Sequence, residues 1–165
     1  MKSKFPWGVV FIISTAAIGW TGSVQPAIAY VKTTFASTTE IHQEVDFKAN
    51  PRRVYDVLLD ASQFQAFSGF PAVIQREAGG TFTLFGGQIA GRNVELVPNK
   101  RIVQAWRANS WPEGVYSIVK FELKEQGSGT RLIMDHTGFP EGKKETLEAG
   151  WNEHYWEPLK KYVDQ

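Results

Sequence analysis

The stretch NSWPEGVYSIVKFELKEQGSGTRLIMDHTGFPEG, residues 109–142, has the pattern of a β-hairpin framed by two similar corners. Apolar residues recur at every second position within Val115–Leu123 and Thr130–Asp135, which predicts two strands. The Gly-Ser-Gly segment between them predicts a tight turn, and so short a connection makes the two strands antiparallel. The corners are Trp111-Pro112-Glu113-Gly114 before the hairpin and Phe139-Pro140-Glu141-Gly142 after it.

Similar patterns continue on the N-terminal side of this hairpin. A first strand is predicted at Ile41–Phe47, and Asn50-Pro51 then supplies an N-cap and a proline suited to the first turn of a helix. Two short helices are predicted in succession, at Arg52–Leu59 and at Ser62–Phe67, with Gly69 ending the second. Short strands separated by glycine or proline turns follow at Val73–Glu77, Thr81–Phe85, Gln88–Val97 and Arg101–Arg107.

The chain ends in a long amphipathic helix, predicted at Lys144–Tyr162. Leu147, Trp151, Tyr155 and Leu159 lie four residues apart and form one apolar face, while Pro158 is expected to distort the final turns. The whole order predicts an α+β fold in which a curved antiparallel sheet of six to seven strands wraps around one long C-terminal helix. Such a sheet leaves a hollow against the helix, and that hollow is the expected functional site.

Composition excludes several functional classes. Among 165 residues there are 18 Lys and Arg against 17 Asp and Glu, so the balance of charge does not favour nucleic acid as a partner. The absence of cysteine removes thiolate chemistry and cysteine-based metal sites. Gly86, Gly87 and Gly91 lack the G-x-G-x-x-G spacing of a dinucleotide loop and are interpreted as turn and strand residues. We expect no cofactor.

The N-terminus has the pattern of a secretory signal peptide. Lys2 and Lys4 precede the apolar run Trp7–Trp20, and Ala27-Ile28-Ala29 has the small side chains that signal peptidase requires. We therefore predict a signal peptide at residues 1–29, a leader at 30–38 and one domain at 39–165. The mature protein would be periplasmic or extracellular, without a stable membrane span. The alternative is an uncleaved membrane anchor formed by residues 7–20.

Titratable residues give little support for catalysis or metal binding. His42, His136 and His154 lie far apart and share no helical or hairpin spacing, so no metal site is predicted. His136 follows Asp135 on a strand, where neighbouring side chains face opposite ways, so the two do not form a catalytic pair. A weaker alternative is an enzyme that acts on a lipophilic ligand with His154 or Glu44 as base.

Aromatic side chains are the more informative candidates, because they concentrate where the sheet should meet the final helix. The residues predicted to line a lipophilic cavity are Phe67, Phe82, Trp106, Tyr116, Trp151 and Tyr155. The residues predicted to contact a partner are Trp111, Pro112, Glu113, Gly114, Lys143 and Lys144.

A set of short motifs extends through Thr39–Val163. They are Phe67-Ser68, Pro71-Ala72, Glu77–Phe82, Leu96–Val103, Trp106-Arg107, Ser110–Gly114, Thr137–Gly142, Gly150-Trp151, Tyr155-Trp156 and Pro158–Lys160. Together they resemble the C-terminal domain of the activator of the heat-shock protein 90 ATPase. This resemblance implies the helix-grip fold of the START and Bet v 1-like (SRPBCC) superfamily, and a co-chaperone role.

Two functional hypotheses of different classes follow. The leading one is an exported, non-enzymatic protein that holds a hydrophobic small molecule or an apolar segment between sheet and helix. The alternative is a co-chaperone module that binds a heat-shock protein 90 type chaperone and stimulates its ATPase. The eukaryotic activator docks through a separate N-terminal domain, whereas only residues 30–39 would precede the first strand here after cleavage.

Overall fold

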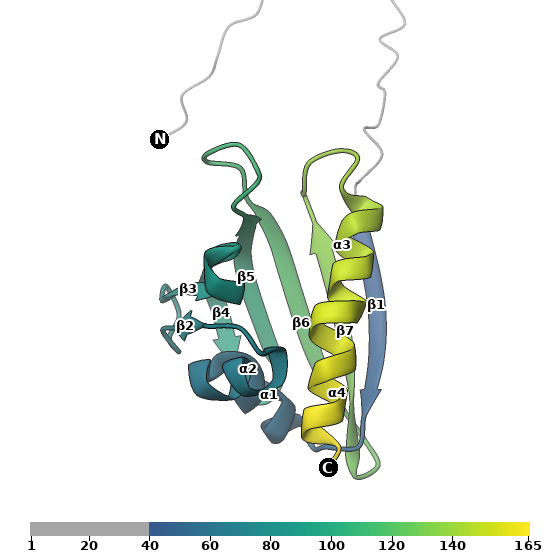
Figure 1. Cartoon of the computed structure of the whole chain (residues 1–165). Coiled ribbons are helices and arrows are strands. Elements are labelled where there is room, and N and C mark those ends of the chain that lie inside the picture. The colour runs from purple at the N-terminus through teal and green to yellow at the C-terminus, as the bar shows by residue number, and fades with distance from the viewer. Residues whose placement is uncertain (1–39) are drawn as a thin grey trace, which may run out of the picture. The chain divides into compact units, whose positions relative to one another are not determined.

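One antiparallel sheet of seven strands carries the described part of the chain, which is residues 40–165 of the computed structural model. The strand order is β1-β7-β6-β5-β4-β3-β2, and the C-terminal helix lies across the sheet (Figure 1). The strands are β1 Glu40–Phe47, β2 Val73–Ile74, β3 Thr81–Leu84, β4 Ile89–Val97, β5 Arg101–Ala108, β6 Ser117–Gln126 and β7 Gly129–Thr137. This architecture confirms the predicted α+β helix-grip fold. The predicted signal peptide and leader lie outside the described residues.

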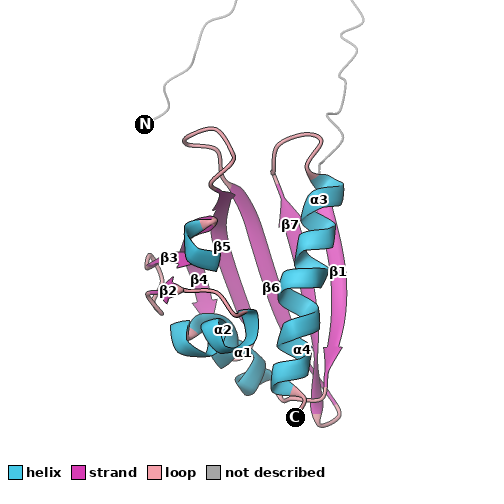
Figure 2. Cartoon of the chain, viewed as in Figure 1, coloured by secondary structure: helices cyan, strands magenta, loops and turns pink. Residues whose placement is uncertain are grey.

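The two short helices follow β1, as predicted, and close one end of the sheet (Figure 2). Helix α1, Pro51–Leu59, begins where the Asn50 side chain accepts a hydrogen bond from the Arg53 N–H at 2.9 Å. Helix α2, Ala61–Ser68, begins at Asp60, whose carboxylate accepts from the Gln63 N–H at 2.9 Å. It ends at Gly69, whose φ of 76° is left-handed.

Some predicted boundaries were wrong. The strand predicted at Val73–Glu77 has only two residues, Val73–Ile74, because the following backbone turns back toward β3 through bonds such as Glu77 N–H to Gln75 O. Phe85 is not in a strand but in the short 3-10 turn η1, Phe85–Gly87. Strand β6 begins and ends later than predicted, and β7 is longer at both ends. The reason is that their hydrogen-bonded ladder extends to the pair Gln126 and Gly129.

The C-terminal helix contains a π-helical segment at its centre. Helix α3, Lys144–Gly150, continues into the π segment η2, Trp151–Trp156, and then into α4, Glu157–Val163. Pro158 has no N–H to donate and its ring would collide with the carbonyl four residues earlier in an α-helix, which favours a wider turn just before it. The distortion therefore precedes Pro158 rather than following it.

Gly91 is required by a close approach inside the sheet. It lies opposite Phe82 in the pairing of β3 with β4, and the Phe82 ring covers it. A Cβ at position 91 would overlap both this ring and the carbonyl oxygen of Ala105 on β5. Gly91 is therefore a strand residue in the core of the sheet, as the sequence predicted.

Within residues 40–165, the structure has no helix of the length and hydropathy needed to cross a bilayer.

Substituting Gly91 by Ala should lower the free energy of unfolding by roughly 1–3 kcal/mol, because the backbone of β5 cannot move aside cheaply. The matched control is Gly150→Ala, where an added Cβ meets nothing within 4 Å and the backbone is helical. That variant should gain about 0.5–1 kcal/mol. Urea unfolding of both variants measures the difference. Equal stability of the two would contradict the proposed packing of Phe82 on Gly91.

Candidate functional site

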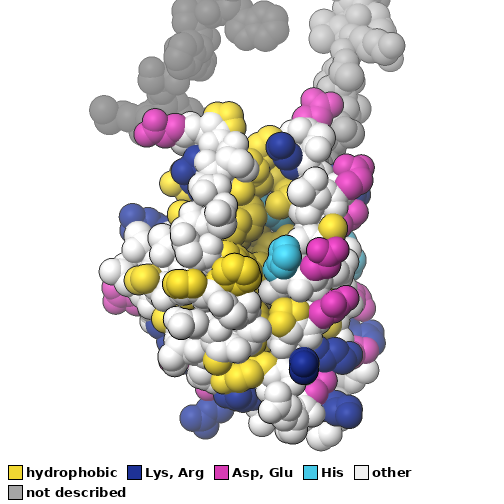
Figure 3. Space-filling model, viewed as in Figure 1, with side chains coloured by type: hydrophobic (Ala, Val, Ile, Leu, Met, Phe, Trp, Pro, Cys, Tyr) yellow, Lys and Arg dark blue, Asp and Glu magenta, His cyan; other side chains and the backbone are white. Residues whose placement is uncertain are grey.

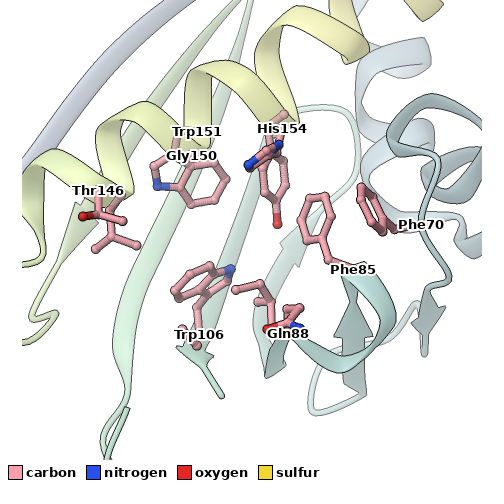
Figure 4. A pocket seen from close by; sticks show the side chains of 12 residues that line it. Phe70, Phe85, Gln88, Trp106, Thr146, Gly150, Trp151 and His154 are labelled. Carbon is pink, nitrogen blue, oxygen red and sulfur yellow. The ribbon is translucent and has the colours of Figure 1, made fainter. Parts of the chain in front are cut away.

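A pocket of about 320 Å³ lies between the C-terminal helix and the sheet, and Figure 3 shows it as an apolar hollow. Three walls enclose it (Figure 4). Helix residues form one wall, β4 and β5 form the floor, and η1 with the loop after α2 forms the third wall. The lining residues are Phe70, Phe85, Gln88, Ile89, Trp106, Ala108, Thr146, Leu147, Gly150, Trp151, His154 and Tyr155.

The π segment sets the helix wall of the pocket. Its wider turn stacks Trp151 on Trp156, five residues later, with ring centroids 5.4 Å apart and planes 15° apart. Trp156 Nε1 donates to the Gln43 side chain on β1 at 2.6 Å, which ties this turn to the sheet edge. Gly150 precedes the π segment and faces the pocket without a side chain.

The third wall depends on an unusual backbone at η1. Phe85 has a φ of 52°, and Gly86 and Gly87 are also left-handed. A bulky residue in this region is strained, so the surrounding contacts must hold it there. The Phe85 ring packs edge-on against Phe70 and Tyr155, with centroids 5.8 and 5.2 Å away. The strained turn thereby presents an aromatic ring to the mouth of the pocket.

A directed chain of hydrogen bonds runs beneath the pocket. Trp151 Nε1 donates to His136 Nδ1 at 3.1 Å, and His136 Nε2 lies 2.7 Å from Ser117 Oγ. Ser117 Oγ in turn donates to the Trp106 carbonyl at 3.0 Å. Because Nδ1 accepts a hydrogen bond, the neutral imidazole carries its proton on Nε2. Burial lowers the pKa of His136 from its usual 6.5 to about 3.

This chain is structural and does not form a nucleophilic pair. A serine nucleophile needs a neighbouring nitrogen that can accept its proton, whereas His136 Nε2 already carries one. Ser117 is 1% exposed and His136 is fully buried, so substrate cannot reach either. Asp135 lies on the outer face, where it contacts His42 at 2.6 Å, as the alternation of the strand predicts. The role of His136 was not predicted from its sequence context, although Leu132, Met134 and His136 alternate along β7 and so face the same, inward side of the sheet.

The predicted cavity residues separate into two groups. Trp106, Trp151 and Tyr155 do line the pocket. Phe67 does not: it is buried against Phe64, with centroids 4.7 Å apart. Phe82 is packed on Gly91, beside a second cavity of only about 10 Å³.

Tyr116 lies outside the pocket altogether. It is 52% exposed and lies under the Arg107 guanidinium, 5.8 Å from its ring centre. The strand begins with Ser117 facing inward, so the residue before it faces solvent. The predicted strand from Val115 had the correct alternation, with odd-numbered residues inward, and that alternation already places Tyr116 outside.

The two residues weighed as a catalytic base lie in different places. His154 is exposed at the rim of the pocket, 6.3 Å from the Phe85 ring centre (Figure 4). Glu44 is on the outer face of β1, where it pairs with Arg131 at 3.4 Å and His42 at 3.7 Å. The structure therefore does not bring these two side chains together. Within residues 40–165, His, Asp and Glu form no cluster suited to a metal ion.

The predicted partner-contact residues are not all on the surface. Trp111 is 5% exposed and packs edge-on against Trp106 at 5.4 Å, so its ring cannot contact a partner. Arg107 Nη2 donates to the carbonyls of Trp111 and Pro112, at 2.9 and 3.3 Å. The rest of the corner, Pro112, Glu113 and Gly114, is exposed. Lys143 and Lys144 are exposed as well.

The two Pro-Glu-Gly corners lie at the same end of the sheet (Figure 1). The pair Ile118 and Thr137 joins the start of β6 to the end of β7, so the loops before and after this hairpin leave the sheet together. Each corner is anchored by its aromatic residue, Trp111 on Trp106 and Phe139 on His136 at 4.9 Å. Both corners therefore depend on buried side chains beneath the pocket, namely Trp106 and His136.

Fold and pocket together define a helix-grip domain with an apolar hollow under its C-terminal helix. A sequence model of the family described as "Activator of Hsp90 ATPase homolog 1-like protein" matches residues 48–164. The chain belongs to this family.

Curated relatives are named as activators of the 90 kDa heat shock protein ATPase. The human homolog 1 is 32% identical over 123 residues, covering 74% of this chain and 36% of the human protein. The Dictyostelium discoideum protein is 32% identical over 125 residues, covering 75% of this chain and 33% of its own length. The chain thus matches about a third of each of these relatives.

Solved structures share the fold. A structure described as an HSP90 activator from Plasmodium falciparum has a TM-score of 0.68 and 26% identity, and the match covers 70% of this chain and 89% of that one. An Aha1 dimer from Colwellia psychrerythraea has a TM-score of 0.63 at 18% identity, covering 76% of this chain and 96% of that one. The second likeness concerns the fold alone.

Stability should fall on mild acidification because of His136. Its pKa is about 3 in the folded protein and 6.5 when exposed, so the unfolded chain gains the proton first as the pH falls below 6.5. Between pH 7.5 and pH 5 this one group should reduce the free energy of unfolding by about 2 kcal/mol. Urea unfolding at several pH values measures this slope.

Two variants isolate the effect. His136→Gln should flatten the slope between pH 7.5 and pH 5, whatever its stability at neutral pH. The bond to Asp135 raises the pKa of His42, so His42 contributes stability at low pH that is lost as the pH rises. His42→Asn should therefore leave the acid loss intact or slightly larger. An unchanged slope in His136→Gln would show that His136 is not the responsible group.

Proposed function

We propose that this domain binds a heat-shock protein 90 type chaperone and stimulates its ATPase. The observation that carries the proposal is the family match over residues 48–164, together with relatives whose names state this activity. Because the chain matches only about a third of those relatives, the activity of the whole relative does not transfer automatically. The proposal is that the shared domain is sufficient for contact and for some stimulation.

The exposed corners supply a contact surface for such a partner. Pro112-Glu113-Gly114 and Lys143-Lys144 project at the same end of the domain, and buried aromatic rings hold the two loops in place. A loop held in one conformation loses little entropy on binding. Lys144 lies 3.8 Å from Glu148, an exposed pair that a partner carboxylate could displace at small cost.

The test is ATP turnover by the chaperone with increasing amounts of this domain. Wild-type domain should raise the turnover, and the double variant Lys143→Glu with Lys144→Glu should need about tenfold more domain for the same effect. The matched control carries Lys100→Glu with Lys124→Glu, two exposed positions at the opposite end of β5 and β6, and should behave as wild type. Binding without stimulation would contradict the proposed activity, and equal effects of both double variants would contradict the proposed surface.

A second function is supported by the pocket. Its volume of about 320 Å³ is at the lower end of the range for small-molecule sites, about 300–1,000 Å³, and its lining is mainly apolar. The pocket supports the holding of a hydrophobic small molecule between sheet and helix, which is the second function that we propose, here for an exported protein. Export rests on the sequence pattern of residues 1–29 and would separate the protein from a cytosolic chaperone.

The intact mass and the cellular location of the native protein decide whether it is exported, and so which of the two proposed functions it can have. A product that begins at Tyr30 outside the cytosol would support export and ligand binding. A full-length cytosolic product would contradict the predicted signal peptide and leave the chaperone as the expected partner. A full-length product in the membrane fraction would instead indicate the anchor at residues 7–20.

A further inference from the structure

The floor of the pocket contains a buried hydrogen-bond donor without an acceptor. Among residues 40–165, the buried side-chain polar atoms that lack a partner are Trp106 Nε1 and Arg107 Nε. Trp106 is 3% exposed, and its indole lines the pocket. Figure 4 shows the nitrogen edge of this ring turned toward the enclosed space. Buried donors are nearly always paired in folded proteins, so this one calls for an acceptor inside the pocket.

Neighbouring groups do not supply that acceptor. The Trp106 N–H lies near enough to the Tyr155 hydroxyl to oppose the rise that burial causes in the pKa of Tyr155, but the approach falls short of a hydrogen bond. The Trp106 carbonyl, by contrast, is occupied by Ser117. Gln88, Thr146, His154 and Tyr155 also line the pocket, so polar side chains are available to hold a water molecule on Trp106 Nε1. An acceptor oxygen on a ligand would take the place of such a water molecule.

The other residues that line the pocket restrict the charge and the size of the molecule that can bind. Asp, Glu, Lys and Arg are absent from the lining, and its one histidine, His154, is exposed at the rim. A charged group held next to Trp106 would therefore lose its hydration without gaining a counter-ion there. Gly150 lies in a regular helical conformation, where glycine is less stable than alanine, and a Cβ there would meet nothing within 4 Å. The missing side chain therefore leaves space open in the pocket and does not relieve a clash.

From these observations we propose that the pocket binds a small, neutral, largely apolar molecule through an oxygen that accepts a hydrogen bond from Trp106 Nε1. A ketone, ester or ether oxygen on a flat ring system fits this description, because aromatic rings form most of the walls. This inference rests on the second function proposed above, that of a ligand-binding pocket, and is independent of the chaperone. It adds the chemistry of the ligand and the residue that selects it.

Three naphthalenes of nearly the same shape test the proposal on the wild-type domain. 2-Acetylnaphthalene has an acceptor oxygen, 2-isopropenylnaphthalene has a CH₂ group in its place, and 2-naphthoate has a charge. The acetyl compound should bind about tenfold more tightly than the isopropenyl compound, the difference expected for one buried hydrogen bond. The naphthoate should bind more weakly than the acetyl compound. Isothermal titration and native mass spectrometry measure these affinities.

An NMR signal reports the contact directly. The chain has six tryptophans, and the indole N–H resonance that is missing in Trp106→Phe identifies Trp106. This resonance should shift with the acetyl compound and much less with the isopropenyl compound. Trp106→Phe keeps an aromatic ring but removes the donor, so it should abolish the preference between the two compounds while its thermal unfolding confirms that it is folded.

A pair of helix variants tests the location. Gly150→Leu fills the open space and should prevent binding of both neutral compounds, whereas Glu153→Leu, on the exposed face of the same helix, should not. Equal binding of the acetyl and isopropenyl compounds would overturn the role of Trp106 but leave the pocket as a binding site. Failure of both neutral compounds to bind would overturn the inference and the ligand-binding function together. Neither result bears on ATPase stimulation.

Discussion

The hydrogen bond from the Trp151 indole to the buried imidazole of His136 is the contact on which the rest of the structure depends. It joins the C-terminal helix to the middle of the sheet, and it is directional, unlike the apolar packing around it. It also requires the neutral imidazole with its proton on Nε2, which then bonds to Ser117. An imidazolium would place two donors against each other in a buried site. The grip of the sheet on the helix is therefore coupled to the protonation of one side chain.

The π segment shows how this contact and the pocket are built together. Pro158 disfavours a regular turn before it, and the widened turn carries Trp151, Tyr155 and Trp156 toward the sheet. Two of these three residues line the pocket, and Trp156 holds the turn against Gln43. Gly150 and the left-handed Phe85 lie on either side of the same hollow. Residues that weaken local structure thus gather around the pocket, where an empty space must be maintained against collapse.

Trp106 links the two surfaces for which functions are proposed. The Trp106 ring lines the pocket. Trp111 packs edge-on against the same ring and anchors the exposed Pro112-Glu113-Gly114 corner. Phe139 anchors the second corner on His136 in the same cluster. The corners are consequently held by the core rather than by contacts of their own. The two proposed functions do not exclude each other, because the exposed corner residues Pro112, Glu113 and Gly114 are not among the residues that line the pocket.

The sequence by itself determined the order of the elements, because strand alternation, the helix cap at Asn50 and glycine turns are local signals. The cap at Asp60 emerged only from the structure. It also determined that Trp151 and Tyr155 face the sheet. Only the tertiary structure decided which aromatic residues surround a cavity and which fill the core. Phe67 and Phe82 are as apolar as Trp106, and no local pattern distinguishes a ring that packs on Gly91 from one that borders open space. The role of His136 depended similarly on tertiary structure. Ser117, 19 residues away in sequence, meets His136 when β6 pairs with β7, and Trp151, 15 residues away, meets it only when the helix docks on the sheet.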